Sequence, residues 1–310
     1  MRQTIHKPRS FSVAAVMRVI VGVGVLVVAG IYLLNRPVTS NAIVEFPHIH
    51  GLGFSDDGTR LFVPAHIGLF VFENGNWSTP DVPAHDYMGY SAVDDGFYSS
   101  GHPDLRTDFE PLLGLVKSED GGRTLNVLAF EGESDFHLMA VGYRSHAVYL
   151  INPSPNSQLS TGLFYTLDDG ATWNPSQATG LGANPIQIAV HPTEAGTVAL
   201  ATETGLYISN DYGSTFTLAG DANPVSAAAF APDGATLLFG YQSLYTLNLS
   251  NGEMTLIQAP SIAEADAVAY IAVNPMTNEI AFATINKDIY LSQENRLSWE
   301  QIAEQGMGRS

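Results

Sequence analysis

A phrase of eight residues occurs three times in this chain and restricts its fold more than any other feature. It reads Ser/Thr-x-Asp-x-Gly-x-Thr and ends in a large apolar residue, and its copies are Ser118–Leu125, Thr166–Trp173 and Ser209–Phe216. In such a phrase the Asp and hydroxyl side chains can bond to turn backbone, the Gly can take a positive φ, and the final side chain can pack on the hairpin. We therefore predict a repeated β-hairpin.

Short β-rich runs alternate with turn clusters from Pro47 onward, and no segment keeps a helical period. The clearest repeat holds four such runs between Ile186 and Ala219, which is the strand content of a propeller blade. The Asp residues of the three phrases are 48 and 43 residues apart, and three degenerate copies fit the same template. The sequence predicts an all-β, six-bladed β-propeller of four-stranded antiparallel blades, with residues 43–46 as an outer strand of the last blade.

The first 42 residues are predicted to be a targeting segment, followed by the propeller over residues 43–305 and a tail over 306–310. Basic residues precede an uncharged apolar run, Val19 to Leu34. When the span is extended back to Val13, with Arg18 near its cytoplasmic end, it reaches 22 residues. A transmembrane helix needs about 20 residues, and its basic flank stays in the cytoplasm. We expect a single-pass anchor in the cell membrane with the propeller outside the cytoplasm. Cleavage after Ala42, which would release a secreted propeller, is the alternative.

The charge of the chain is divided unevenly. Five of its 13 basic residues lie at or before Arg36 and no acidic residue precedes Glu45, so the remainder carries 8 basic and 31 acidic residues, a net charge of −23. Such a field repels nucleic acid and anionic membrane surfaces, and both are excluded as partners of the propeller. The absence of cysteine means that the fold depends on its core rather than on disulfides.

The eight-residue phrase resembles the Asp-box, or BNR, repeat of sialidase-like β-propellers, which also occurs in sortilin-type and photosystem II assembly factor-type propellers. The phrases His48–Leu52, Met88–Ser91, Ser100–Asp104 and Asp135–Leu138 look like those of a bacterial branch of Asp-box proteins that is commonly labelled glycosyl hydrolase. The resemblance implies the propeller fold. It leaves the function open, because Asp-boxes lie on the blade periphery, away from the axis where ligands bind.

Candidate site residues emerge when the six blades are aligned at the start of the first strand. That start and the end of the second strand open on one face of a propeller, and strand residues two apart point the same way. Polar, ligand-like side chains gather there in blades one to three only. They are His48, His50 and His66 in blade one, Asp86, Met88 and His102 in blade two, and Asp135 and His137 in blade three. Two long connections, over residues 102–111 and 152–162, are expected to cover them.

Imidazole and thioether groups favour a transition metal, copper or zinc, and the Met favours copper. We predict a metal site formed by His50, His137 and His66 or His102. His48 and Met88 are further candidate ligands, and Asp86 and Asp135 are expected to orient the imidazoles.

Two other functions fit the same face. The first is a glycoside hydrolase with Asp86 and Asp135 as its catalytic carboxylates and with Asp104, Arg106 and Tyr87 contacting a sugar, although rings such as Tyr87 also suit the core. Classical sialidase chemistry is excluded, because Arg106 alone of the exported arginines is placed for the site. The second is an assembly module that binds a protein partner and carries out no chemistry. The sequence does not choose among small-molecule, glycan and protein ligands.

Overall fold

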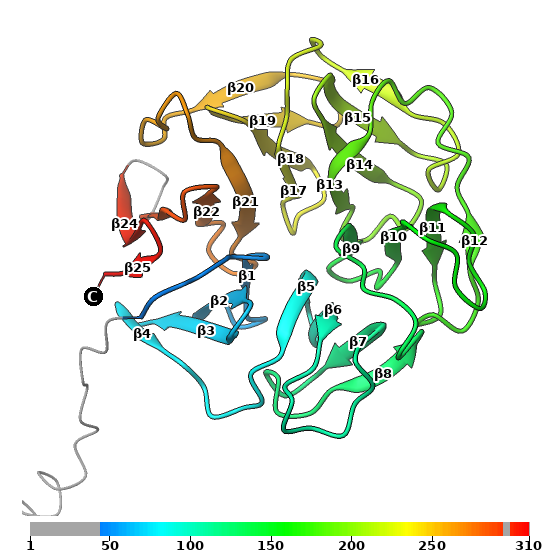
Figure 1. Cartoon of the computed structure of the whole chain (residues 1–310). Coiled ribbons are helices and arrows are strands. Elements are labelled where there is room, and N and C mark those ends of the chain that lie inside the picture. Colours follow the sequence, from blue (N-terminus) through cyan, green and yellow to red (C-terminus); the bar gives the residue numbers. More distant parts are fainter. Residues whose placement is uncertain (1–43, 294–297, 310) are drawn as a thin grey trace, which may run out of the picture. The chain divides into compact units, whose positions relative to one another are not determined.

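Six antiparallel sheets stand in a ring around a central axis in the computed structural model, which describes residues 44–293 and 298–309 (Figure 1). The predicted six-bladed, all-β propeller is confirmed. The predicted transmembrane helix lies outside the described residues, and none of the residues that are described forms an apolar helix of membrane-spanning length.

Each blade takes its strands from one continuous stretch of sequence. Blade one holds β1 (Gly53–Phe54), β2 (Arg60–Ala65), β3 (Gly68–Glu73) and β4 (Asn76–Ser78). Blade two holds β5 (Asp86–Val93), β6 (Gly96–His102), β7 (Leu115–Ser118) and β8 (Asn126–Ala129). Blade three holds β9 (Met139–Val141), β10 (Val148–Asn152), β11 (Gly162–Thr166) and β12 (Asn174–Pro175).

The other three blades repeat this order. Blade four holds β13 (Pro185–Val190), β14 (Val198–Thr202), β15 (Gly205–Ser209) and β16 (Thr217–Ala219). Blade five holds β17 (Ala227–Phe230), β18 (Thr236–Gly240), β19 (Leu244–Asn248) and β20 (Met254–Ile257). Blade six has five strands, β21 (Val268–Val273), β22 (Ile280–Thr284), β23 (Ile289–Ser292), β24 (Trp299–Glu304) and β25 (Met307–Gly308). The last sheet therefore continues beyond residue 305, where the sequence analysis ended the propeller.

The hydrophobic core lies between neighbouring blades rather than in one central mass. The described residues form six apolar clusters, one for each pair of adjacent blades. Between blades two and three, for example, Tyr98, Leu115 and Phe136 are fully buried. Each sheet buries both faces, which explains why the inner strands are almost continuously apolar.

The ring closes between blades six and one. The backbone N–H of Phe46 donates to the Gly306 carbonyl at 2.7 Å, and the N–H of Gly308 donates to the Val44 carbonyl at 2.8 Å. This pairing continues the last sheet with an N-terminal segment, so the predicted outer strand is confirmed for residues 44–46. Phe46 itself is fully buried against Phe70 and Trp77.

The repeated phrase forms the turn between the third and fourth strands of blades two, three and four. In blade three, Asp168 Oδ1 accepts bonds from the Thr166 hydroxyl at 2.7 Å and from the Thr172 N–H at 2.8 Å. Gly170 has a φ of 83°, and Trp173 packs on the core between blades two and three. The local interactions predicted from the phrase are therefore present. These turns lie at the end of each blade opposite to the turn between its second and third strands.

Replacing Asp168 with Asn should reduce the decrease in the free energy of unfolding that the protein shows when the pH falls. Hydrogen bonds from the Thr172 and Thr166 side chains and the Thr172 backbone hold the pKa of Asp168 below its ordinary value of 3.8. The stabilisation is thus present above that value and is lost as the pH falls through the lowered folded-state pKa. Urea unfolding at about pH 5 and about pH 3 should show a smaller difference for Asp168→Asn than for the wild type. The control is Asp221→Asn, which removes an exposed charge outside the phrases; equal differences in all three proteins would contradict this.

Candidate functional site

A cavity of about 470 Å³ lies at the propeller axis, and residues from all six blades line it. The first strands β1, β5, β9, β13, β17 and β21 stand around the axis (Figure 1), and each contributes residues to the lining of the cavity. His50, Met88 and His137 are among its lining residues, as the blade alignment predicted for one face of blades one to three. On the side of blades four and five the equivalent positions are Ile186 and Ser226, so the lining is chemically asymmetric.

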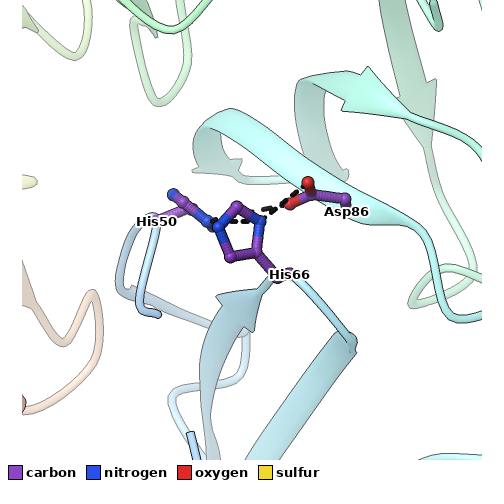
Figure 2. Close-up of side chains that lie close together, drawn as sticks. All are labelled: His50, His66 and Asp86. Atoms are coloured by element: carbon purple, nitrogen blue, oxygen red, sulfur yellow. Dashed lines mark hydrogen bonds and ion pairs between the residues drawn. The ribbon is translucent and has the colours of Figure 1, made fainter. Parts of the chain in front are cut away.

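Three side chains from separate segments converge beside this cavity (Figure 2). His50 precedes β1, His66 lies in the turn between β2 and β3, and Asp86 begins β5 of the next blade. His66 lies between the other two, with Nδ1 at 3.2 Å from His50 Nε2 and at 2.8 Å from Asp86 Oδ2. One ligand atom from each residue lies within 4.8 Å of the other two. We call this set the first trio.

The backbone explains the convergence. Ile49 forms a bridge with Ala65, and the His50 N–H donates to the Pro64 carbonyl at 2.9 Å, so the segment before β1 lies along the end of β2. The turn that follows β2 then carries His66 across to blade two. His50 and Asp86 expose only 14% and 19% of their side chains, whereas His66 exposes 38%.

Burial, and then the neighbouring His66, lower the pKa of His50 to about 4, against an opposing contribution from Asp86. His50 is therefore a neutral imidazole near neutral pH. A neutral imidazole keeps the lone pair that a metal ion requires.

A related set, the second trio, lies one blade further on. His102 ends β6, and Asp135 and His137 precede β9. Asp135 Oδ2 is 2.7 Å from His137 Nε2 and 3.3 Å from His102 Nε2. His102 Nδ1 lies 3.1 Å from the Pro111 carbonyl in the long loop between β6 and β7.

Asp135 and His137 do not lie on a strand, contrary to the prediction. The first strand of blade three is only Met139–Val141, because the chain before it is held elsewhere. Phe136 is fully buried between blades two and three, and its N–H donates to the Ser100 hydroxyl at 2.8 Å. Asp135 and His137 therefore meet through a bent loop and not through strand alternation.

Two predicted ligands, His48 and Met88, lie outside the first trio. The His48 ring is exposed and contacts the His66 ring with centroids 4.9 Å apart. Met88 is buried at the cavity, where Met139, which the sequence analysis overlooked, is also a lining residue. The blade alignment could have identified Met139, because it lies two residues after His137 and residues two apart on a strand face the same side.

The predicted sugar-contacting residues have structural partners. Tyr87 is fully buried in the cluster between blades one and two, so the expected ligand contact is wrong and the core alternative holds. Asp104 is paired with Arg106 and accepts the Ala84 N–H at 2.9 Å, which ties the long loop to the connection between blades one and two. Arg106 is largely exposed.

A further cluster, Asp94, Asp95 and His146, was not anticipated. It lies in the turns between the first and second strands of blades two and three, at the opposite end of these blades from the two trios. Lys117 Nζ lies 2.7 Å from Asp95 Oδ2, and His146 Nε2 lies 2.7 Å from Asp94 Oδ1. The lysine supplies a cation of its own, so this cluster is an ion-pair network.

No family model matches the chain, and no curated protein matches it significantly. Several solved structures are similar to it in fold. A GH74 xyloglucanase from Xanthomonas campestris superposes with a TM-score of 0.53 and 16% identity over 85% of this chain and 46% of the other. A GH74 enzyme from Niastella koreensis has a TM-score of 0.55 and 16% identity over 84% and 46%.

A third similar structure is the extracellular domain of a protein described as a one-component system, from B. thetaiotaomicron. Its TM-score is 0.52, with 12% identity over 86% of this chain and 34% of the other. The chain thus spans less than half the length of these proteins. At such identities the likeness shows the fold alone, so the class that fold and comparisons define is the β-propeller.

Proposed function

We propose that this propeller is a ligand-binding module that holds a transition-metal ion, copper or zinc, at His50, His66 and Asp86. The observation that carries the proposal is the convergence of two imidazole nitrogens and a carboxylate oxygen within 4.8 Å of one another. Imidazole and carboxylate are ligands that both metals accept.

The separations within the first trio support a metal site of ordinary size. With metal–ligand bonds of about 2.0–2.1 Å, neighbouring ligands of a tetrahedral site lie about 3.3–3.4 Å apart. Here His66 Nδ1 lies 3.2 Å from His50 Nε2 and 2.8 Å from Asp86 Oδ2, and His50 Nε2 lies 3.7 Å from the other carboxylate oxygen, Asp86 Oδ1. Three protein ligands leave a fourth position for water or for a ligand from the cavity, the arrangement of an open rather than a structural site. The buried thioethers of Met88 and Met139 at the cavity favour copper.

The proposal includes the location expected from the sequence. The basic N-terminus and the apolar run that follows it support a membrane anchor with the propeller outside the cytoplasm. There the site would meet metal ions of the extracytoplasmic medium.

Isothermal titration of the full chain with Cu(II) and with Zn(II) tests the metal site. We expect saturable binding by the wild type and an affinity lowered more than about 100-fold in His50→Ala/His66→Ala, because loss of an outer partner alone costs roughly 10- to 100-fold. The control is His146→Asn, which removes an imidazole at the far end of the blades from a position with a φ of 51° that Asn tolerates. No saturable binding, or equal affinity in the double variant, would refute the proposal.

Asp86 has two possible roles that one further variant separates. The sequence analysis assigned it to orienting an imidazole, whereas its distances to both nitrogens suit a direct ligand. Asp86→Asn should weaken binding more than about 100-fold if the carboxylate binds the ion, and by roughly 10- to 100-fold if it only orients His66.

Glycoside hydrolysis is the second candidate. It is favoured by the two carboxylates Asp86 and Asp135, each of which keeps one buried oxygen without a hydrogen bond among the described residues. Aryl glycosides would be cleaved faster by the wild type than by Asp86→Asn and Asp135→Asn if these groups are the catalytic pair.

A further inference from the structure

A large apolar side chain fills the space between neighbouring blades at five of the six junctions. It belongs to a residue at the start of a blade's fourth strand, where the repeated phrase or a degenerate copy ends, and it packs into the cluster shared with the preceding blade. These residues are Trp77, Leu125, Trp173, Phe216 and Trp299. Trp299 also donates from Nε1 to the Gln258 carbonyl of the preceding blade at 2.7 Å. The phrase therefore fills the junctions as well as forming the turns.

The junction between blades four and five differs from the other five. The residue ahead of β20 is Glu253, which is exposed. Four of the nine buried residues in the cluster between these blades are alanines, so the facing surfaces do not supply the missing volume. A groove of about 570 Å³ lies between the two blades.

The groove lies where the phrase of blade five would place its final side chain. It is lined by the turn between β19 and β20 and by Gly220, which directly follows β16. Gly220 is thus the counterpart in blade four of Gln258, which directly follows β20 and accepts the bond from Trp299. The volume that an aromatic ring occupies elsewhere in the propeller is therefore open at this junction.

The walls of the groove suit an aromatic ring. Ile208 and Ala219 of blade four and Leu247 and Met254 of blade five are among the lining residues. The Met254 side chain is 37% exposed and lies against Gly220, where an added Cβ would be 2.4 Å from the methionine methyl carbon. Methionine is flexible, and its sulfur makes favourable contacts with aromatic rings, so this wall can adapt to an inserted ring.

The strands beside the groove suit an extended polypeptide rather than a free small molecule. β16 and β20 are the outermost strands of their sheets. The first three residues of β20 are exposed, including Leu256. The outer edge of such a strand presents backbone N–H and C=O groups with which an incoming extended segment can pair.

The charge around the groove selects a basic partner. No Lys or Arg occurs between Arg144 and Lys287, and residues 185–257, which form blades four and five, contain six acidic residues. Two of these, Asp221 and Glu253, are exposed and adjoin the lining residues Gly220 and Met254. Charge complementarity across an interface favours partners of the opposite sign.

We propose that the groove between blades four and five binds an extended, basic segment of a partner protein, which inserts one aromatic side chain where the other junctions hold a side chain of the propeller itself. This inference goes beyond the proposed function and does not depend on it, because the first trio belongs to blades one and two.

An array of short synthetic peptides tests the chemistry of the partner. Each peptide carries Trp, Phe or Ala at its centre, Lys or Glu on both sides of it, and Ser, Thr or Val elsewhere. We expect the fluorescently labelled full chain to bind peptides that combine an aromatic centre with Lys. An Ala centre should weaken binding roughly 10-fold or more, because aromatic anchors carry much of the affinity of such interfaces. Tryptophan amide is titrated beside the peptides as a free aromatic molecule.

Variants of the full chain connect binding to the groove. Ala219→Leu adds volume inside the groove and should weaken the best peptide roughly 10-fold or more. Ala171→Leu adds the same volume at an exposed position of blade three and should leave the affinity unchanged. Glu253→Lys reverses an exposed charge and should weaken Lys-containing peptides, an effect that shrinks at high salt. Thermal unfolding verifies that each variant is folded.

The outcomes are distinguishable from those of the metal titration. Binding that is lost in Ala219→Leu but kept in Ala171→Leu and in His50→Ala/His66→Ala supports the groove. No saturable binding of any aromatic, Lys-containing peptide up to about 1 mM overturns the proposal, as does equal affinity in Ala219→Leu and the wild type. Tryptophan amide that binds as tightly as the best peptide indicates a site for small aromatic molecules and overturns the assignment to a protein partner.

Discussion

Trp77→Ala should destabilise the propeller by roughly 3–5 kcal/mol, the usual cost of truncating a buried aromatic side chain. The ring is buried at the junction of blades one and six, with its centroid 4.8 Å from that of Phe46 and 5.0 Å from that of Phe72. Its Nε1–H donates to the Ile302 carbonyl at 2.8 Å, which joins blade one to the strand β24. Truncation therefore removes core volume and a bond between the two ends of the ring.

Urea unfolding measures this effect, and Trp77→Phe divides it into its parts. Phenylalanine keeps most of the apolar contact but leaves the buried Ile302 carbonyl without its donor, so we expect a smaller loss of about 1–3 kcal/mol. If the free energy of unfolding of Trp77→Ala lies within about 1 kcal/mol of the wild-type value, closure of the ring does not depend on this side chain.

Gly101→Ala should lower the free energy of unfolding by roughly 3 kcal/mol or more, and it should also weaken metal binding. Gly101 has a φ of 116°, and a Cβ there would lie 2.0 Å from the Asp86 carbonyl oxygen and 3.0 Å from the Met88 nitrogen. Relief requires the backbones of β5 and β6 to separate at the point where Asp86 pairs with His102. Asp86 belongs to the first trio, so its displacement should weaken metal binding there.

Gly121→Ala is the matched control for this substitution. Gly121 also has a positive φ, 72°, but a Cβ there meets nothing within 4 Å. The equivalent positions of the other two phrases hold Asp169 and Tyr212 with φ of 53° and 59°, so a side chain is tolerated there. For Gly121→Ala we expect the free energy of unfolding to fall by only about 1 kcal/mol and the metal affinity to stay unchanged. Equal effects of both substitutions on unfolding and titration would show that steric contact at Gly101 is unimportant.

Local features of the chain were predictable because their interactions lie within a few residues. The Asp168 turn closes through bonds to Thr166 and Thr172, all inside one eight-residue phrase. The repeat of that phrase indicated the blades, and the blade alignment brought His50, Met88 and His137 to one cavity. The outer pairing of residues 44–46 was also predicted, since an unpartnered β-rich segment precedes the first blade.

Contacts between blades were not predictable in the same way. Tyr87 was offered as a ligand contact, but the way in which blades one and two pack buries it completely. Asp135 and His137 were assigned to a strand, but Phe136 anchors in the core and bends the segment. Both outcomes depend on residues far apart in the sequence, whose approach is set by packing between sheets.

The repeated phrase and the four-strand repeat around it determined the kind of fold and the number of blades, and the blade alignment indicated the face that carries the histidines. Only the tertiary structure decided how those histidines divide, because His66 meets Asp86 and His102 meets Asp135 across blade boundaries. A strand's periodicity specifies which way a side chain faces within its own sheet. It does not specify the neighbour supplied by the next sheet, and that neighbour divides the histidines into two groups, one beside Asp86 and one beside Asp135.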